Sequence, residues 1–157
     1  MKKLILAILL ALPFAAMSQI YTAGYSSKFA LADKSYSDKI LSLWKDYETN
    51  MLDQHLDLFS DTVSMMLANG SVVKGKAENL KGVKEFRSSI KDYKVTVGAW
   101  LSVKSLDKGD NIVLVWGDES FTDKDGTKVQ QRVHEVWVFN KAGKISFMMQ
   151  YEGGGGM

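Results

Sequence analysis

The sequence predicts one α+β domain in the shape of a cone, with three N-terminal helices packed on a strongly curved antiparallel sheet. Before residue 91 the apolar residues recur mainly at helical spacing, whereas from Tyr93 onwards apolar and polar residues alternate in long runs. Short turns join these runs, so successive strands must be antiparallel, and helices that are segregated from strands indicate an α+β fold. Gly98 and Gly117 lie in mid-strand, where they allow a bend. A bent sheet with helices across its concave side leaves a cone that is open at one end.

The N-terminus has the pattern of a secretory signal peptide. Lys2 and Lys3 precede an apolar run from Leu4 to Ala16, and small residues follow at the positions that a signal peptidase inspects. We therefore expect residues 1–18 to be removed and the protein to be exported, periplasmic or secreted. Of the 20 Lys and Arg residues two leave with this segment, so 18 basic residues face 18 acidic ones. This balance predicts no nucleic-acid partner, and no membrane partner after removal of the signal.

Cysteine is absent, which excludes thiolate metal sites and thiol catalysis. The two histidines, His55 and His134, do not have the spacing of metal ligands, so neither a metal nor a cofactor is expected. Without disulfides, stability must come from packing, and a homodimer interface is one way to add to it.

The helices and the first hairpin lie in the N-terminal half. An extended lead-in over residues 19–36 is followed by a first helix from Ser37, which ends near Asn50, and by a second, shorter helix that Asp53 caps. Residues 61–74 are predicted to form a hairpin around Asn69-Gly70, which is a strong turn sequence. A third helix runs from about Glu78 to Ile90.

Four long strands and a glycine-rich tail complete the chain. The domain is expected to span residues 37–152, and residues 153–157 are expected to be flexible. The four strands are predicted at Tyr93–Leu106, Asn111–Phe121, Val129–Phe139 and Ile145–Tyr151.

Glu135 is the strongest candidate for a functional group. It shares one strand face with Val133, Trp137 and Phe139, and an acid among large apolar groups has a raised pKa and can donate a proton near neutral pH. The alternative is a structural acid that forms a salt bridge with Arg132 or a lysine. His134 points to the opposite face, unless a slip of one residue inverts the two faces.

Other candidates have structural explanations of equal weight. Asp61 is either a carboxylate at the mouth of the cone or the residue that ends the second helix. Trp44 and Tyr47 either line a cavity or belong to the core of an amphipathic helix. Gln150 is expected to supply an uncharged polar contact at the base of the pocket.

Three tryptophans come from neighbouring strands. Trp100, Trp116 and Trp137 together would form an aromatic wall suited to a flat apolar ligand. The alternative is that at least one fills the core and another lies at a dimer contact.

Several short segments resemble the nuclear transport factor 2-like superfamily, which includes SnoaL-like polyketide cyclases and ketosteroid isomerases. These segments are Leu58-Phe59-Ser60-Asp61, Gly75-Lys76, His134-Glu135-Val136-Trp137 and Met149-Gln150-Tyr151. The resemblance covers residues 37–151 and is closest to exported bacterial members without assigned chemistry.

The resemblance implies only part of an isomerase site. The position of the isomerase base falls at about Leu67, which cannot accept a proton, and that of the isomerase tyrosine falls near Leu43. The hydrogen-bond-donating acid alone has a counterpart, Glu135. The resemblance therefore does not imply steroid isomerisation by that mechanism.

Three functions remain open from the sequence. The first is a pocket protein that binds a small, largely apolar molecule. The second is a cofactor-free enzyme of the isomerase, cyclase or hydratase type, in which Glu135 acts with Asp61 or His134 as acid and base. The third is a dimerisation or interaction module of the cell envelope.

Overall fold

The computed structural model describes residues 23–154, so the predicted signal peptide and the last three residues of the tail lie outside the described part of the chain. The described residues form two α-helices, a short 3-10 helix and seven strands. In chain order these are β1 (Phe29–Leu31), α2 (Lys34–Thr49), η2 (Leu56–Leu58), β2 (Phe59–Met66), β3 (Val72–Lys74), α3 (Lys76–Ser89), β4 (Lys91–Ser105), β5 (Asn111–Thr122), β6 (Lys128–Phe139) and β7 (Ile145–Gly154).

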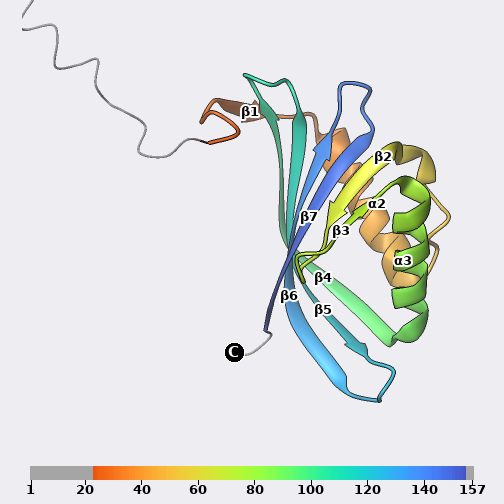
Figure 1. The fold of residues 1–157 in the computed structure, drawn as a ribbon. Coiled ribbons are helices and arrows are strands. Elements are labelled where there is room, and N and C mark those ends of the chain that lie inside the picture. The colour runs from red at the N-terminus through yellow and green to blue at the C-terminus, as the bar shows by residue number, and fades with distance from the viewer. Residues whose placement is uncertain (1–22, 155–157) are drawn as a thin grey trace, which may run out of the picture.

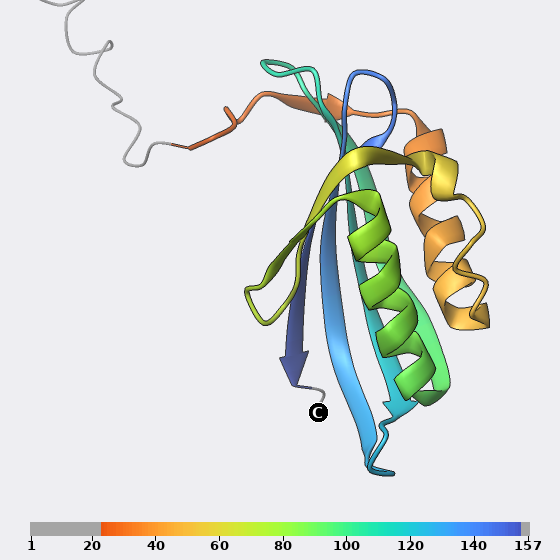
Figure 2. The same cartoon turned by 45° about the vertical axis from the view of Figure 1, so that its right-hand side comes forward.

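All seven strands belong to one curved sheet, and both helices lie against its concave side (Figures 1 and 2). The strand order is β1-β4-β5-β6-β7-β2-β3. The four long strands are antiparallel, as predicted, but β2 pairs with β7 in parallel. The sheet is therefore mixed, and the prediction of a purely antiparallel sheet was wrong. Short turns fix the direction of neighbouring strands only, and β2 and β7 are far apart in the chain.

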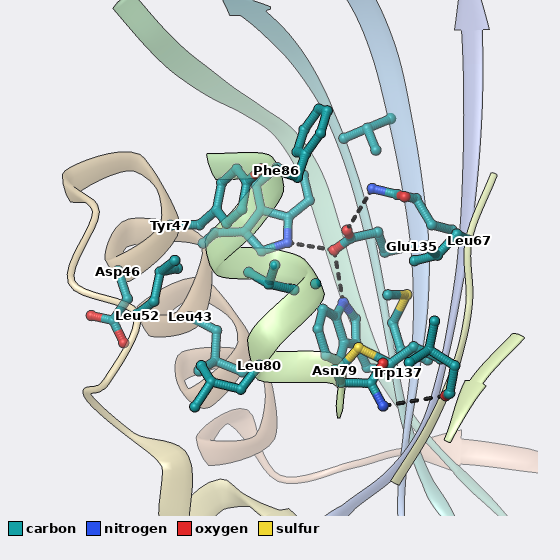
Figure 3. Close-up of a pocket in the computed structure, with 18 of the residues that line it drawn as sticks. Leu43, Asp46, Tyr47, Leu52, Leu67, Asn79, Leu80, Phe86, Glu135 and Trp137 are labelled. Atoms are coloured by element: carbon teal, nitrogen blue, oxygen red, sulfur yellow. Dashed lines mark hydrogen bonds between the residues drawn. The ribbon is translucent and has the colours of Figure 1, made fainter. Parts of the chain in front are cut away.

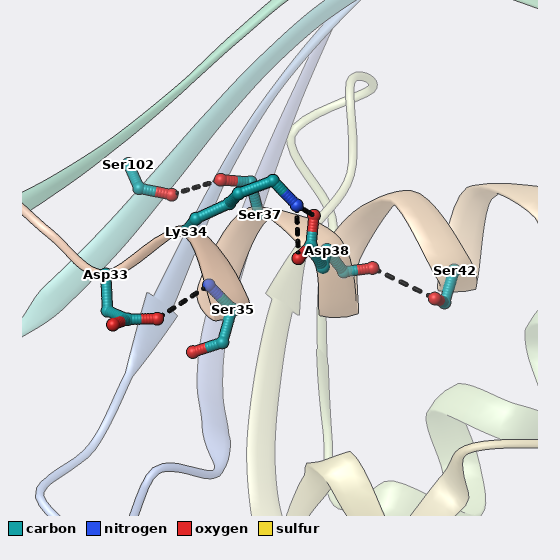
Figure 4. A network of polar contacts seen from close by, with 7 residues as sticks. All are labelled: Asp33, Lys34, Ser35, Ser37, Asp38, Ser42 and Ser102. Carbon is teal, nitrogen blue, oxygen red and sulfur yellow. Dashed lines mark hydrogen bonds and ion pairs between the residues drawn. The ribbon is translucent and has the colours of Figure 1, made fainter.

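Helix α2 begins three residues before the predicted start. The Asp33 side chain accepts a hydrogen bond from the backbone N–H of Ser35 at 2.8 Å, which caps the first turn (Figure 4). Ser37 is not a cap but a buried residue within the helix, and its hydroxyl lies 2.5 Å from that of Ser102 on β4. This contact fixes the first turn of α2 on the sheet.

The predicted second helix is absent from the described structure, where only the 3-10 turn η2 occupies this region. Asn50 and His55 both have left-handed backbones, with φ of 58° and 54°. Only three residues, Leu56–Leu58, lie between His55 and the start of β2 at Phe59, and they are too few for an α-helix. Asp53 caps no helix and instead forms an ion pair with Lys84 of α3 at 2.6 Å.

Part of the predicted extended lead-in is a strand. Its residues 29–31 form β1, which pairs antiparallel with residues 103–105 of β4 at the edge of the sheet. The Tyr25 hydroxyl donates a hydrogen bond to Asp110 at 3.0 Å, which fastens the segment before β1 to the β4–β5 turn. At the other terminus β7 continues to Gly154, so the first two residues of the predicted flexible tail are part of a strand.

The core lies between α2 and the sheet. Its fully buried hydrophobic side chains come from α2, β2, β5, β6 and β7. Neither helix of residues 23–154 is long and apolar enough to cross a bilayer. The largest fully buried hydrophobic residues are Ile40, Val63, Val113, Val115, Phe139 and Ile145.

Candidate functional site

A cavity of about 580 Å³ lies between the two helices and the concave face of the sheet (Figure 3). Most of its wall is apolar, which is typical of sites for small organic molecules. The apolar wall includes Leu43, Leu52, Met65, Leu67, Leu80, Val83, Phe86 and Met148.

Glu135 lies in this wall as a buried carboxylate with three hydrogen-bond donors around it (Figure 3). One oxygen, Oε2, accepts from the indole N–H of Trp44 at 2.6 Å and from that of Trp137 at 2.9 Å. The other, Oε1, has a longer contact, 3.4 Å, with the side-chain amide of Gln150. Oε2 is thus held by two indoles, whereas Oε1 keeps free capacity for a further partner.

Burial is the main cause of the unusual acidity of Glu135. It raises the pKa of this carboxyl from 4.5 to about 7, against the opposing effect of the Trp44, Trp137 and Gln150 hydrogen bonds. The negative charge of Glu119 raises the pKa further. The predicted alternative, a salt bridge to Arg132, is wrong, because the Arg132 guanidinium lies 3.8 Å from Asp118 instead. Near neutral pH the Glu135 carboxyl therefore exists in both forms, as an O–H donor and as an acceptor.

Gly117 makes room for the tryptophan that holds Glu135. A Cβ atom at this position of β5 would lie 2.6 Å from the carbonyl oxygen of Thr96 and 2.7 Å from the ring of Trp44. Real Cβ atoms do not approach other atoms so closely. A residue without a side chain is thus required where Trp44 crosses β5 to reach Glu135.

A second buried carboxylate, Glu119, faces the same cavity. It accepts hydrogen bonds from the Tyr93 hydroxyl and from the Gln131 amide, each at 2.6 Å. Burial and the charge of Glu119 raise the pKa of Tyr93 far above its usual range, so this phenol stays a donor. Glu119 was not among the predicted site residues, although it shares a strand face with Val115 and Phe121, just as Glu135 shares one with Val133 and Trp137.

Four of the residues that the sequence suggested for a ligand site line this cavity. They are Trp44, Tyr47, Trp137 and Gln150. Tyr47 packs edge-to-face on Tyr93 with ring centres 4.9 Å apart, and burial raises its pKa well above the usual value. The cavity wall and the core are continuous at α2, so the two interpretations of its aromatic residues both hold.

His134 and Trp116 lie on the other face of the sheet. Their rings stack at 4.6 Å, and His134 also stacks on Tyr151 at 5.8 Å. Trp116 is 40% and Trp100 is 51% exposed, and neither lines the main cavity. Of the two alternatives for the tryptophans, the wall of three is therefore not formed, because strand alternation places Trp116 and Trp137 on opposite faces. For the same reason His134 cannot act together with Glu135.

Asp61 is also remote from the cavity chemistry. It lies on β2, where its side chain is 88% exposed and forms an ion pair with Lys76 at 2.7 Å. The hydrogen bond from Lys76 lowers the pKa of Asp61. Asp61 neither ends a helix nor meets Glu135. The other histidine, His55, lies near the end of α2, where its Nδ1 atom is 2.7 Å from a carboxylate oxygen of the buried Asp46.

No group of three or more metal-ligating side chains with suitable geometry occurs within residues 23–154. The polar groups that line the cavity are two indoles, two phenols, five carboxyls, five side-chain amides and the ammonium group of Lys76.

No family model and no curated protein matches the sequence. Among solved structures, a protein of unknown function from Exiguobacterium sp. 255-15, described as NTF2-like, matches with a TM-score of 0.60 and 20% identity, over 75% of this chain and 98% of that one.

Two enzymes match similarly. The epoxide hydrolase/cyclase-like enzyme SalBIII of pyran ring formation in salinomycin has a TM-score of 0.62 and 15% identity, over 76% of this chain and 92% of its own. A LEH-like epoxide hydrolase from Mycobacterium tuberculosis has a TM-score of 0.60 and 12% identity, over 75% and 82% of the two chains. At such identities the likeness concerns the fold. This chain has two helices on a curved mixed sheet, and the solved structures that match it share this arrangement. It therefore has the nuclear transport factor 2-like fold.

Proposed function

We propose that this protein is a cofactor-free receptor for a small, largely apolar molecule, which it holds in the cavity under α2 and α3. The main support for this proposal is the hydrogen bonding of the buried Glu135 carboxyl. Its Oε2 is fixed by Trp44 and Trp137, and its Oε1 has free capacity in an apolar cavity of about 580 Å³. A buried polar group with unused capacity is costly unless a partner completes it.

An acid–base mechanism has less support. A proton shuttle needs two titratable groups that converge on one substrate atom. Glu135 and Glu119 face the same cavity, but the strand register places their backbone positions four residues apart. This corresponds to about 13 Å along the sheet. We therefore favour binding over isomerisation, cyclisation or hydration.

The test uses the pH dependence of binding of a neutral ketone, acetylnaphthalene, measured by calorimetry. A ketone only accepts hydrogen bonds, so it needs the protonated form of Glu135. Because the pKa of Glu135 is about 7, the affinity of the protein for the ketone is expected to fall by roughly tenfold or more between about pH 5.5 and pH 8.5. In Glu135→Gln the amide remains a donor at every pH, so this fall is expected to vanish.

Asp61→Asn serves as the control, because it removes an exposed acid outside the cavity chemistry and is expected to keep the pH dependence of the unaltered protein. Lack of ketone binding at both pH values would contradict the proposal. An equal pH dependence in the unaltered protein and in Glu135→Gln would show that the ligand does not meet Glu135.

We also propose that the protein forms a homodimer through the outer face of the sheet. Trp116, His134 and Tyr151 stack across three strands there, and Leu101 adds an exposed apolar side chain. Exposed apolar patches of this kind are typical of interaction sites. Sedimentation velocity should give a dimer for the unaltered protein and a monomer for Trp116→Arg. A monomeric unaltered protein would contradict the proposal.

Export remains part of the proposal and is supported by the N-terminal sequence alone. Expression of the full chain with detection of its N-terminus in the periplasm or medium tests it. We expect cleavage before Gln19, whereas an intact Met1 in the cytoplasm would contradict export.

A further inference from the structure

The cavity has two ends with different polar chemistry. Its inner end contains Glu135 among buried residues, including Trp137 and Met148. Its outer end contains Glu119 and is bordered by the exposed residues Phe86 and Glu152. The register of β5 and β6 places Glu119 opposite Gln131 and Glu135 opposite Val115, so the two carboxylates lie along one axis of the cavity.

The hydrogen bonds at Glu119 leave it able only to accept. Tyr93 donates to Oε2 and Gln131 donates to Oε1, so both protein partners supply hydrogens. Each carboxylate oxygen has two lone pairs and therefore keeps one for another donor. A ligand group that completes Glu119 must be a hydrogen-bond donor.

Glu119 also has no cationic partner among the ion pairs of the described residues. Strand β7, which lies beyond β6 in the sheet, contributes another acid, Glu152, whose pKa is raised by partial burial and by the charge of Glu119. A buried carboxylate without a counter-charge is costly, and a cation that enters beside it offsets that cost.

Arg87 of α3 lies beside Tyr93 at this end of the cavity, but its hydrogen bonds are directed elsewhere. Its guanidinium lies 5.4 Å from the centre of the Tyr93 ring. Its Nε and Nη2 atoms donate to the carbonyl oxygens of Tyr47 and Glu48 at 2.9 Å and 3.1 Å. Arg87 therefore fastens α3 to the end of α2 and leaves the carboxylate of Glu119 without a salt bridge.

Aromatic rings complete the outer end. Tyr93 and Phe121 lie with ring centres 6.4 Å apart, and Phe86 contacts Phe121 edge-on at 6.0 Å. Aromatic faces attract cations as well as apolar groups. Carboxylate and rings together suit an organic ammonium group better than a metal ion or a neutral hydroxyl.

We infer that the ligand is an elongated amphiphilic amine, whose ammonium group binds Glu119 at the outer end while its apolar body extends towards Glu135. This inference rests on the proposed binding function and names the chemical class of the ligand. An acceptor at the inner end of the molecule, such as an ether or carbonyl oxygen, meets the protonated carboxyl of Glu135.

Three matched probes test the inference at about pH 6, where an alkyl amine is fully protonated. They are methoxynaphthylethylamine, the corresponding alcohol and the corresponding carboxylate. A charge-assisted hydrogen bond is about twice as strong as a neutral one. We therefore expect the amine to bind at least about tenfold more tightly than the alcohol, and the carboxylate not to bind measurably.

Glu119→Gln should remove the preference for the amine, so that the amine and the alcohol bind within about threefold of each other. Glu119→Asp, which keeps the charge, should retain a preference, and Asp61→Asn should behave as the unaltered protein. Because the comparison of the three probes on the unaltered protein needs no variant, it decides the inference even if Glu119→Gln does not fold.

The possible results separate the two proposals. Equal binding of amine and alcohol overturns the assignment of an amine and leaves the binding function intact. A preference that persists in Glu119→Gln overturns the role of Glu119. Binding of none of the three probes overturns both the ligand class and the proposed function.

Discussion

Replacement of Glu135 by glutamine should change how the stability of the protein depends on pH. In the folded chain the pKa of Glu135 is about 7, whereas its ordinary value is 4.5. Between these two pH values the unfolded chain releases the proton and the folded chain keeps it. The free energy of unfolding therefore falls as the pH rises through this window, and the loss is complete above about pH 7.

The size of the effect follows from the two pKa values. A difference of one pKa unit corresponds to 1.36 kcal/mol, so the change of Glu135 from 4.5 to about 7 corresponds to roughly 3 kcal/mol. Glu135→Gln cannot titrate, and its side-chain oxygen can still accept from Trp44 and Trp137. The difference in stability between variant and unaltered protein should therefore grow by roughly 3 kcal/mol in favour of the variant between about pH 4 and pH 8.

Urea unfolding of the two proteins at several pH values measures this difference. Subtraction of the two curves cancels the titration of all other groups, because both proteins share them. A difference that stays constant over the whole pH range would refute the reasoning, since it would mean that burial does not perturb Glu135.

Two further substitutions test how Glu135 is held. Gly117→Ala should destabilise the protein by about 1–3 kcal/mol, because the added Cβ would meet the carbonyl oxygen of Thr96 and the Trp44 ring. Gly98→Ala, where the nearest atom lies 3.5 Å from the added Cβ, is the control. Equal losses of stability in the two variants, measured by thermal unfolding, would contradict the role of Gly117. Trp44→Phe removes one N–H that lowers the pKa of Glu135, so the pKa should rise above about 7 and stability should fall by about 1–3 kcal/mol; an unchanged titration by NMR would show that this indole does not matter.

The sequence was sufficient to predict the long strands and the position of Glu135. The alternation of Val133, Glu135 and Trp137 on β6 assigns the acid to an apolar face, and the structure places all three on the concave side. The same alternation on β5 would have revealed Glu119. On that strand the large apolar residue Trp116 points to the opposite face. Gly117 separates Glu119 from Val115, so the apolar character of the face is less evident from the sequence.

Other features depend on contacts that no local pattern encodes. The parallel pairing of β2 with β7 joins distant parts of the chain, so turn chemistry does not predict it. The prediction of a second helix was wrong because His55 adopts a left-handed backbone and β2 already begins at Phe59. Because that helix is absent, Asp61 does not end a helix and is instead an exposed residue of β2.

The most direct test of the account is an NMR titration of the Glu135 side-chain carboxyl, assigned through Glu135→Gln. We expect a midpoint at about pH 7 in the ligand-free protein and a higher midpoint when acetylnaphthalene is bound, because the ketone stabilises the protonated form. A midpoint near the ordinary value of 4.5, unaffected by the ketone, would contradict a buried acid that faces a ligand cavity.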